Sequence, residues 1–181
     1  MPFIFGGFYS WGLYSRLILC ILNSISKLFE KLIQNQLNPF FDKKLSEHLC
    51  GYRKGYTTQY ALLNLIESWK KFRDKKGYAA AVLMDLSKAF DTINHELLVA
   101  KLHAYGVTGP SLRLLMSYLS NRHQRTKVND MNSTWEELLT GVPQGSVLGP
   151  LLFNIYLNDI FYFVEYNKVS FFLSAICHFS N

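Results

Sequence analysis

An aspartate near the end of a strand-like apolar run is the first candidate for chemistry in this sequence. Residues 78–86, YAAAVLMDL, are almost continuously apolar, and Asp85 is the one charged residue among them. A carboxylate in such a setting costs free energy unless it is paired, hydrogen-bonded or bound to a metal ion. Asp85 is therefore a candidate metal ligand. The alternative is a turn or helix-capping aspartate, a role that Asp91 suits better.

A glycine-rich segment, residues 141–150 with the sequence GVPQGSVLGP, is the second candidate. Three glycines and two prolines surround Gln144, whose amide offers both hydrogen-bond donors and acceptors. Glycine allows a backbone to approach a ligand closely. The alternative is an ordinary turn between a strand and a helix, which the composition of the segment favours.

A basic loop, residues 51–55 with the sequence GYRKG, is the third candidate. An arginine such as Arg53 on a short loop between glycines can bind a phosphate through two parallel hydrogen bonds. The alternative is a solvated basic turn.

Two helices are predicted before the apolar run. The first covers residues 24–37, with Asn23 or Ser24 as its cap and Pro39 as its end. Its spacing is typical of an amphipathic helix with apolar residues on one face (Ile25, Leu28, Phe29, Leu32, Ile33) and polar residues on the other (Lys27, Glu30, Lys31, Gln34). The second begins near Thr58 after a cap at Thr57 or Thr58. Its predicted buried face holds Ala61, Leu62, Leu65, Ile66 and Trp69, and a basic stretch follows.

Three more helices and a hairpin are predicted after the apolar run, which reads as a strand buried on both faces. One helix is capped by Thr92 or Asn94 and ends at Gly106. Another begins at Pro110, with Leu112, Leu115, Met116 and Leu119 facing inward. A hairpin joins residues 124–128 to 134–140, and a last helix runs from Pro150 to about Ile160. Helices that alternate with strands indicate an α/β or α+β domain.

Composition favours a globular, basic protein whose cysteines are reduced. The chain has 181 residues, of which 49% are hydrophobic and 18% charged, with a formal net charge of +6. A basic balance permits contact with phosphate backbones, although it also serves simple solubility. The three cysteines form no zinc-binding pattern, and a disulfide framework is not expected. No basic residue precedes the apolar N-terminal segment, and no apolar run is long enough to predict a membrane span.

Several long blocks resemble the reverse transcriptases of non-LTR retrotransposons. LMDLSKAFDTINHELLVAKLHAYG, SYLSNRHQRTKVN and GVPQGSVLGPLLFNIYLND are similar to the palm of these enzymes. The upstream blocks NSISKLFEKLIQNQL and CGYRKGYTTQYALLNLIE are similar to their fingers. The order and spacing of the blocks match over residues 21–169. The resemblance implies an α+β fold, an incomplete right-hand polymerase with fingers and palm, in which helices pack on a small, mostly antiparallel sheet.

The resemblance also implies roles for individual residues. Asp85 would be the catalytic, metal-binding aspartate of the palm, and Leu86 would lend its carbonyl to the metal ion. Phe90 would lie under the incoming sugar and exclude a 2′-hydroxyl. Gln144 and Gly145 would lie against the nucleotide and template, and Arg53 would contact the triphosphate. RNA template, DNA primer, dNTP and Mg²⁺ are the implied partners and cofactor.

The resemblance weakens where further carboxylates are needed. Two divalent ions about 3.8 Å apart repel by on the order of 17 kcal/mol at an effective dielectric of about 20, so several carboxylates must surround them. In the family these come from an Ala-Asp-Asp hairpin after a Leu-Asn-Asp motif. Here Leu157-Asn158-Asp159 is present, but the chain contains no Asp-Asp pair. We therefore expect an inactive fragment, truncated before the Ala-Asp-Asp motif. The alternatives are a remnant that only binds nucleic acid and a structural or interaction domain.

The resemblance divides the chain into four parts. These are a divergent apolar segment (1–20), a fingers-like part (21–77), a partial palm (78–168) and a divergent tail in place of the hairpin (169–181).

Overall fold

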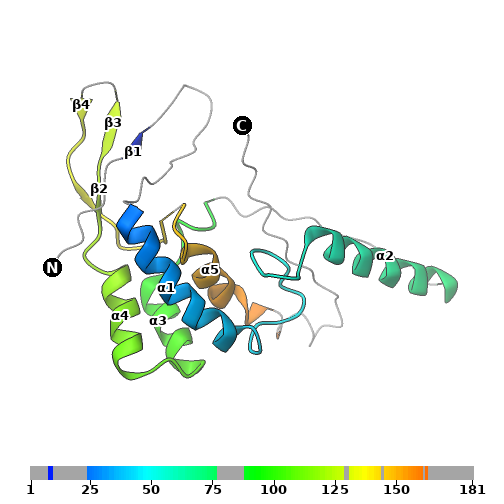
Figure 1. Cartoon of the computed structure of the whole chain (residues 1–181). Coiled ribbons are helices and arrows are strands. Elements are labelled where there is room, and N and C mark those ends of the chain that lie inside the picture. The colour runs from blue at the N-terminus through cyan, green and yellow to red at the C-terminus, as the bar shows by residue number, and fades with distance from the viewer. Residues whose placement is uncertain are drawn as a thin grey trace. The chain divides into compact units, whose positions relative to one another are not determined.

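The computed structural model describes residues 8–9, 24–76, 88–128, 131–143, 145–160 and 162. Within these ranges the chain is α+β, as the sequence predicted (Figure 1). The helices are α1 (Ser24–Phe41), α2 (Thr58–Asp74), α3 (His95–Ala104), α4 (Gly109–Leu119) and α5 (Gly149–Leu157). The strands are β1 (Phe8–Tyr9), β2 (His123–Gln124), β3 (Thr126–Val128), β4 (Met131–Asn132) and β5 (Glu136–Glu137).

Two compact units make up the chain. Unit 1 comprises Met1–Lys44 and Lys88–Tyr156, and unit 2 comprises Leu45–Ser87 and Leu157–Asn181. No helix in the described ranges is both long and apolar enough to cross a membrane.

Helix α1 continues two residues past Pro39, where the sequence predicted it to end. Proline has no N–H and cannot bond to the carbonyl four residues earlier, so it usually disrupts a helix interior. Here it lies in the last turn and is exposed to solvent. The helical hydrogen bonding then resumes, because the Asp42 amide donates to the Asn38 carbonyl at 2.8 Å.

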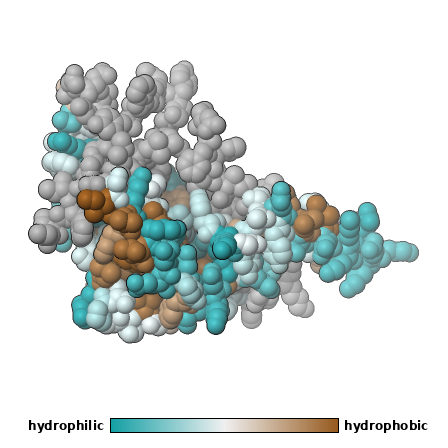
Figure 2. Space-filling view, in the orientation of Figure 1, coloured by the Kyte–Doolittle hydropathy of each residue, from teal (hydrophilic) through white to brown (hydrophobic). Residues whose placement is uncertain are grey.

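The inward face of α1 differs from its apolar face. An amphipathic helix normally buries its apolar stripe, yet Ile25 and Leu28 are 74% and 64% exposed, whereas Glu30 is 1% exposed. Figure 2 shows hydrophobic side chains on the outer surface over α1. Periodicity locates the two faces of a helix, but the hydrogen-bond partners of Glu30 decide which face turns inward.

Helices α3 and α4 pack side by side and supply much of the core of unit 1 (Figure 1). Asn94 caps α3 by accepting a hydrogen bond from the Leu97 amide at 2.9 Å, and Gly106 follows its end with a φ of 96°. Both features confirm the prediction. In α4, Leu115 and Leu119 are buried as predicted, but Met116 is 45% exposed. A third of a turn separates Met116 from Leu115, enough to carry it out of the contact with α3.

Helix α5 is the most completely buried element of the described chain. It begins at Gly149, one residue before the predicted Pro150, and ends at Leu157, before the predicted Ile160. Almost every residue in it is buried (Gly149, Leu151, Leu152, Phe153, Asn154, Ile155). A helix that is apolar on all sides needs neighbours on all sides, so its position depends on contacts with the rest of unit 1.

The predicted hairpin is present, with short and interrupted strands. Strand β3 pairs antiparallel with β4, with Val128 opposite Met131, and β2 pairs antiparallel with β5, with Gln124 opposite Glu136. The returning strand thus begins at Met131, earlier than the predicted Thr134, and is broken before Glu136. Strand β1 adds a parallel neighbour to β3. The sheets are therefore small and mostly antiparallel.

Unit 2 contains α2 and the loop before it. Thr57 caps α2, as predicted, by accepting a hydrogen bond from the Tyr60 amide at 3.2 Å. The predicted buried face is wrong for most of its members: Ala61 is buried, but Leu62 and Ile66 are 52% and 44% exposed. The basic stretch around the end of α2 is exposed, as its composition suggests (Lys70, Lys71, Arg73, Lys75, Lys76).

Several predictions concern residues outside the described ranges. The strand over residues 78–86 is one, and the tail from residue 169 is another. The four-part division also stays a prediction, because its boundaries at residues 20/21, 77/78 and 168/169 all fall there.

Candidate functional site

The segment around Phe90 and the loop of residues 141–149, here called the glycine loop, lie side by side in unit 1. The Val142 amide donates to the Phe90 carbonyl at 2.9 Å. The Gly141 amide donates to the Ile93 carbonyl at 2.7 Å, and the His95 ring lies 2.7 Å from the Gly141 carbonyl. These bonds join two segments that are about fifty residues apart in sequence. Two of the segments predicted to carry site residues therefore meet.

Only glycine fits at the start of the glycine loop. Gly141 has a φ of 85°, and a Cβ atom built on it would lie 2.8 Å from both the Cα and the carbonyl oxygen of Asp91. Cβ atoms essentially never approach other heavy atoms so closely. The Thr140 hydroxyl also donates to the Asp91 carbonyl at 3.0 Å. Asp91 thus contributes its backbone to this junction, in keeping with the turn role predicted for it.

The ring of Phe90 packs against a buried aromatic ring. It stacks on Phe153 of α5, with 4.7 Å between ring centroids and 28° between ring planes. Phe153 is 3% exposed, whereas Phe90 is half-buried. One side of the Phe90 ring is therefore fixed by a core residue, and the ring remains accessible to solvent.

A buried carboxylate holds the other end of the glycine loop. Oε2 of Glu30 accepts hydrogen bonds from the amides of Val147 at 2.6 Å and Leu148 at 3.1 Å. Nε2 of Gln34, one turn further along α1, donates to the Val147 carbonyl at 3.0 Å. The Ser146 hydroxyl caps α5 by accepting from the Gly149 amide at 2.9 Å. The loop is thereby fixed at both of its ends.

Tyr118 of α4 completes this buried polar group. Its hydroxyl donates to Oε1 of Glu30 at 3.2 Å. Burial raises the pKa of Tyr118 well above its ordinary value, and the neighbouring negative charge of Glu30 raises it further. The phenol therefore stays protonated and remains a donor to Glu30.

Arg53 lies in unit 2 and closes its own loop. Its Nη1 donates to the carbonyls of Ser46 at 2.6 Å and Leu49 at 3.3 Å. Its guanidinium also stacks over the Tyr56 ring, 4.0 Å from the centroid. Beside it, burial raises the pKa of the Cys50 thiol, and the charge of Arg53 partly opposes that rise. The predicted basic loop is thus an ordered one.

Three predicted site residues, Asp85, Leu86 and Gln144, lie outside the described ranges. Gly145 is described: it is exposed and has a φ of 84°. Among the described residues, no group of three His, Cys, Asp or Glu side chains could hold a metal ion. The metal site predicted at Asp85 therefore remains a prediction.

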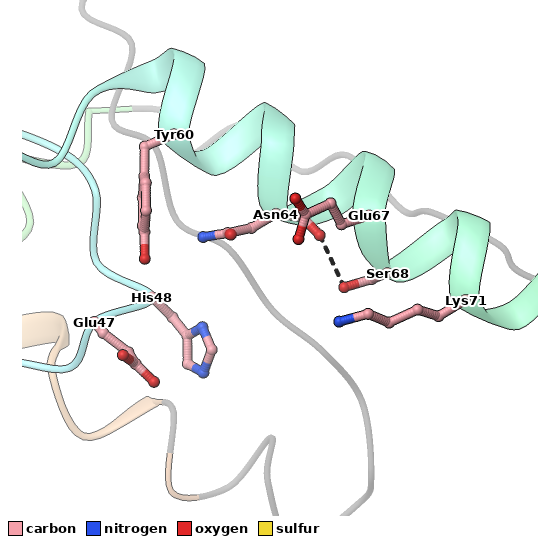
Figure 3. A pocket seen from close by; sticks show the side chains of 7 residues that line it. All are labelled: Glu47, His48, Tyr60, Asn64, Glu67, Ser68 and Lys71. Carbon is pink, nitrogen blue, oxygen red and sulfur yellow. Dashed lines mark hydrogen bonds between the residues drawn. The ribbon is translucent and has the colours of Figure 1, made fainter.

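A polar pocket of about 220 Å³ lies between the loop before α2 and α2 itself, within unit 2 (Figure 3). Its lining is Glu47, His48, Tyr60, Asn64, Glu67, Ser68 and Lys71. Two carboxylates face one lysine there, so the charges give no preference for an anion such as a triphosphate. Of the predicted site residues that the structure describes, Arg53, Phe90 and Gly145, none lines this pocket.

The sequence pattern does not reveal the partners of the glycine loop on α1 and α4. It places Glu30 and Gln34 on the solvent face of an amphipathic helix, and it gives no role to Tyr118. Periodicity carries no signal for them, because the apolar residues of α1 point away from Glu30. The one available signal is that Glu30 lies inside a block that resembles the fingers.

Comparisons with known proteins match the blocks recognised in the sequence. Residues 14–177 match the family described as reverse transcriptase (RNA-dependent DNA polymerase). The chain is similar to the probable RNA-directed DNA polymerase from transposon BS of Drosophila melanogaster, 36% identical over 142 residues, which are 77% of this chain and 16% of that protein. The RNA-directed DNA polymerase from mobile element jockey of the same species is 32% identical over 143 residues, 77% of this chain and 15% of that protein.

A fungal protein is similar over more of the chain. The putative COX1/OXI3 intron 1 protein of Saccharomyces cerevisiae is 30% identical over 155 residues, 83% of this chain and 17% of that protein. The chain thus spans only 15% to 17% of the length of these three curated relatives.

Proposed function

Because the chain belongs to the reverse transcriptase (RNA-dependent DNA polymerase) family, we propose that it supplies the fingers and part of the palm of a non-LTR retrotransposon polymerase. The family works on a nucleic-acid template and primer with nucleotide substrates and generally uses a divalent metal ion. For this chain we propose an RNA template, a DNA primer, dNTP substrates and Mg²⁺. The hydrogen-bonded junction of the Phe90 segment with the glycine loop is the observation that carries the proposal.

The proposed nucleotide site is built on this junction. Phe90 would lie under the sugar, where its ring, which stacks on Phe153, would exclude a 2′-hydroxyl. Gly145 would lie against the nucleotide, since it is exposed and has no side chain to hold a ligand away. Gln144 would add hydrogen bonds from its amide. The position of Phe90 at one end of the loop supports this arrangement.

For Arg53 we propose contact with the triphosphate. The competing role is closure of the basic loop, which its bonds to the Ser46 and Leu49 carbonyls already provide. An Arg53→Lys variant separates the two roles. Lysine keeps the positive charge but loses the planar fork of the guanidinium, so a phosphate role alone predicts weaker nucleotide affinity with unchanged stability, whereas a closure role predicts a destabilised loop.

Asp85 and the Leu86 carbonyl are the residues proposed to hold Mg²⁺. When bound, the ion would activate the primer 3′-oxygen and stabilise the leaving group. The chain contains no Asp-Asp pair to share such an ion. We therefore expect the 181 residues by themselves not to extend a primer, although they should still bind nucleic acid.

The second candidate function is nucleic-acid binding without catalysis, and the end of α2 favours it. Trp69 and Phe72 are 41% and 50% exposed there, and they alternate with exposed lysines and Arg73. Aromatic rings offer stacking surfaces to bases, and the cations contact phosphates.

Primer extension and a salt titration test both functions. With an RNA template, a DNA primer, dNTPs and Mg²⁺, we expect no product from the 181-residue chain. Product that disappears in an Asp85→Asn variant would overturn the expected inactivity while supporting the polymerase assignment. In parallel, fluorescence anisotropy should show affinity for the RNA–DNA duplex that falls as salt rises.

Charge-removing variants locate the binding surface. Lys70→Gln with Lys71→Gln removes two charges from α2, and Lys27→Gln with Lys31→Gln removes two from α1 as a matched control. The α2 pair should reduce the slope of log affinity against log salt concentration by about 0.9 for each phosphate that the protein no longer neutralises. The α1 pair should leave that slope unchanged. A wild-type chain with no affinity for the duplex at low salt would refute both functions and leave a structural or interaction role.

A further inference from the structure

The buried carboxylate of Glu30 has no part in the roles proposed above. We infer that Glu30 is a positioning residue. Its hydrogen bonds hold the backbone of the glycine loop in place, and this raises nucleotide affinity although Glu30 does not touch the nucleotide. The inference rests on the proposed function, because it assumes that the glycine loop lies against a nucleotide. Everything on which it depends lies within unit 1.

The carboxylate of Glu30 complements the start of α5 electrostatically. The amides of Val147 and Leu148 immediately precede α5, at the end of the helix where N–H groups lack partners within the helix. Oε2 of Glu30 accepts from both, at 2.6 and 3.1 Å, and the residue is 1% exposed. The N-terminal end of a helix carries a partial positive charge, which a carboxylate complements. Glu30 therefore acts as a cap that comes from a different helix.

The backbone of Val147 is held on both of its polar groups. Glu30 binds the amide of Val147, and Gln34 binds its carbonyl at 3.0 Å. Two side chains one turn apart on α1 thus hold a single residue. Tyr118 donates to the other oxygen of Glu30 at 3.2 Å and restrains the carboxylate itself. Val147 is consequently a fixed point of the loop.

The residues between the fixed points include those proposed to meet the nucleotide. The Val142 amide is bound to the Phe90 carbonyl, and the Val147 amide is bound to Glu30. Only four residues, 143–146, lie between these anchors, and among those that the structure describes Gly145 is the one proposed to meet the nucleotide. A short segment held at both ends has few conformations, and a binding group held in place before the ligand arrives binds it more tightly.

Hydrogen–deuterium exchange on the 181-residue chain tests the fixing of the loop. Glu30→Gln keeps the size of the side chain but removes its charge, Glu30→Ala removes the side chain, and Glu67→Gln on the exposed face of α2 is the matched control. We expect the Val147 and Leu148 amides to exchange about tenfold faster in Glu30→Gln, with the buried amides of α3 as the internal reference. Equal acceleration in α3, or none at the two loop amides, would overturn the inference.

Nucleotide affinity tests the consequence, with a fluorescent dNTP and Mg²⁺ as the probe. Glu30→Gln and Gln144→Ala should each weaken binding, and the double variant should lose less affinity than the sum of the two single losses, because Glu30 acts through the loop that carries Gln144. A Glu30 variant that only loosened the fold would give additive losses, and that result would overturn the positioning role. A wild-type chain that binds no nucleotide would instead refute the proposed function, while the exchange data would still decide whether Glu30 fixes the loop.

Discussion

Substituting alanine for Gly141 should destabilise unit 1 far more than the same change at Gly109. Both glycines have a positive φ, 85° and 58°, so an L-residue at either position costs about 1–2 kcal/mol. At Gly109 the new Cβ meets nothing within 4 Å, whereas at Gly141 it lies 2.8 Å from the Asp91 backbone. Backbone cannot rotate away as a side chain can, and forced overpacking adds about 1–3 kcal/mol.

The two variants share a unit, so their difference isolates the contact with Asp91. We expect Gly141→Ala to lose about 2 kcal/mol more free energy of unfolding than Gly109→Ala, which corresponds to a thermal midpoint lower by about 4–8 °C. Urea unfolding followed by circular dichroism measures the free energy, and differential scanning calorimetry measures the midpoint. Equal losses in the two variants would show that the Phe90 segment does not lie against the glycine loop.

Two further predictions concern α1 and α4. Pro39→Ala should raise the free energy of unfolding by about 1 kcal/mol, because alanine restores an N–H to the last turn of α1; a decrease in urea denaturation would contradict this. Tyr118 has a pKa raised by burial and by the charge of Glu30 above its ordinary value of 10.0. The stability that the protonated Tyr118 hydroxyl contributes is therefore fully present below pH 10.0, and it is lost as the pH rises from 10.0 toward the raised pKa. Urea unfolding of Tyr118→Phe should show a smaller loss of stability in strong alkali than the wild-type chain, and parallel losses would count against the raised pKa.

Local features of the fold could be predicted from the sequence. Thr57 and Asn94 are both predicted caps, and both accept a hydrogen bond from an amide three residues later. Gly106 is a predicted helix end, and its positive φ confirms it. Caps and ends are determined by bonds within a few residues, so the information lies in the local sequence.

The direction in which a helix face turns could not be predicted in the same way. The apolar stripe of α1 predicts one inward face, but Glu30 turns inward and Ile25 outward. The deciding bonds reach Val147 and Leu148, more than a hundred residues away. Likewise, the resemblance points to Phe90 and Gly145 separately, whereas their placement on joined segments depends on long-range hydrogen bonds. No pattern in one segment contains such pairings.

The distance in sequence between Glu30 and Val147, 117 residues, has a consequence for how the chain acquires its structure. Helix α1 is synthesised early, yet the amides that satisfy its carboxylate emerge only when nearly all of unit 1 has left the ribosome. Contacts of such long range close large loops and form slowly. Until they form, Glu30 must stay hydrated, so α1 has to dock late, after the α3–α4 pair, whose contacts are local, has already assembled.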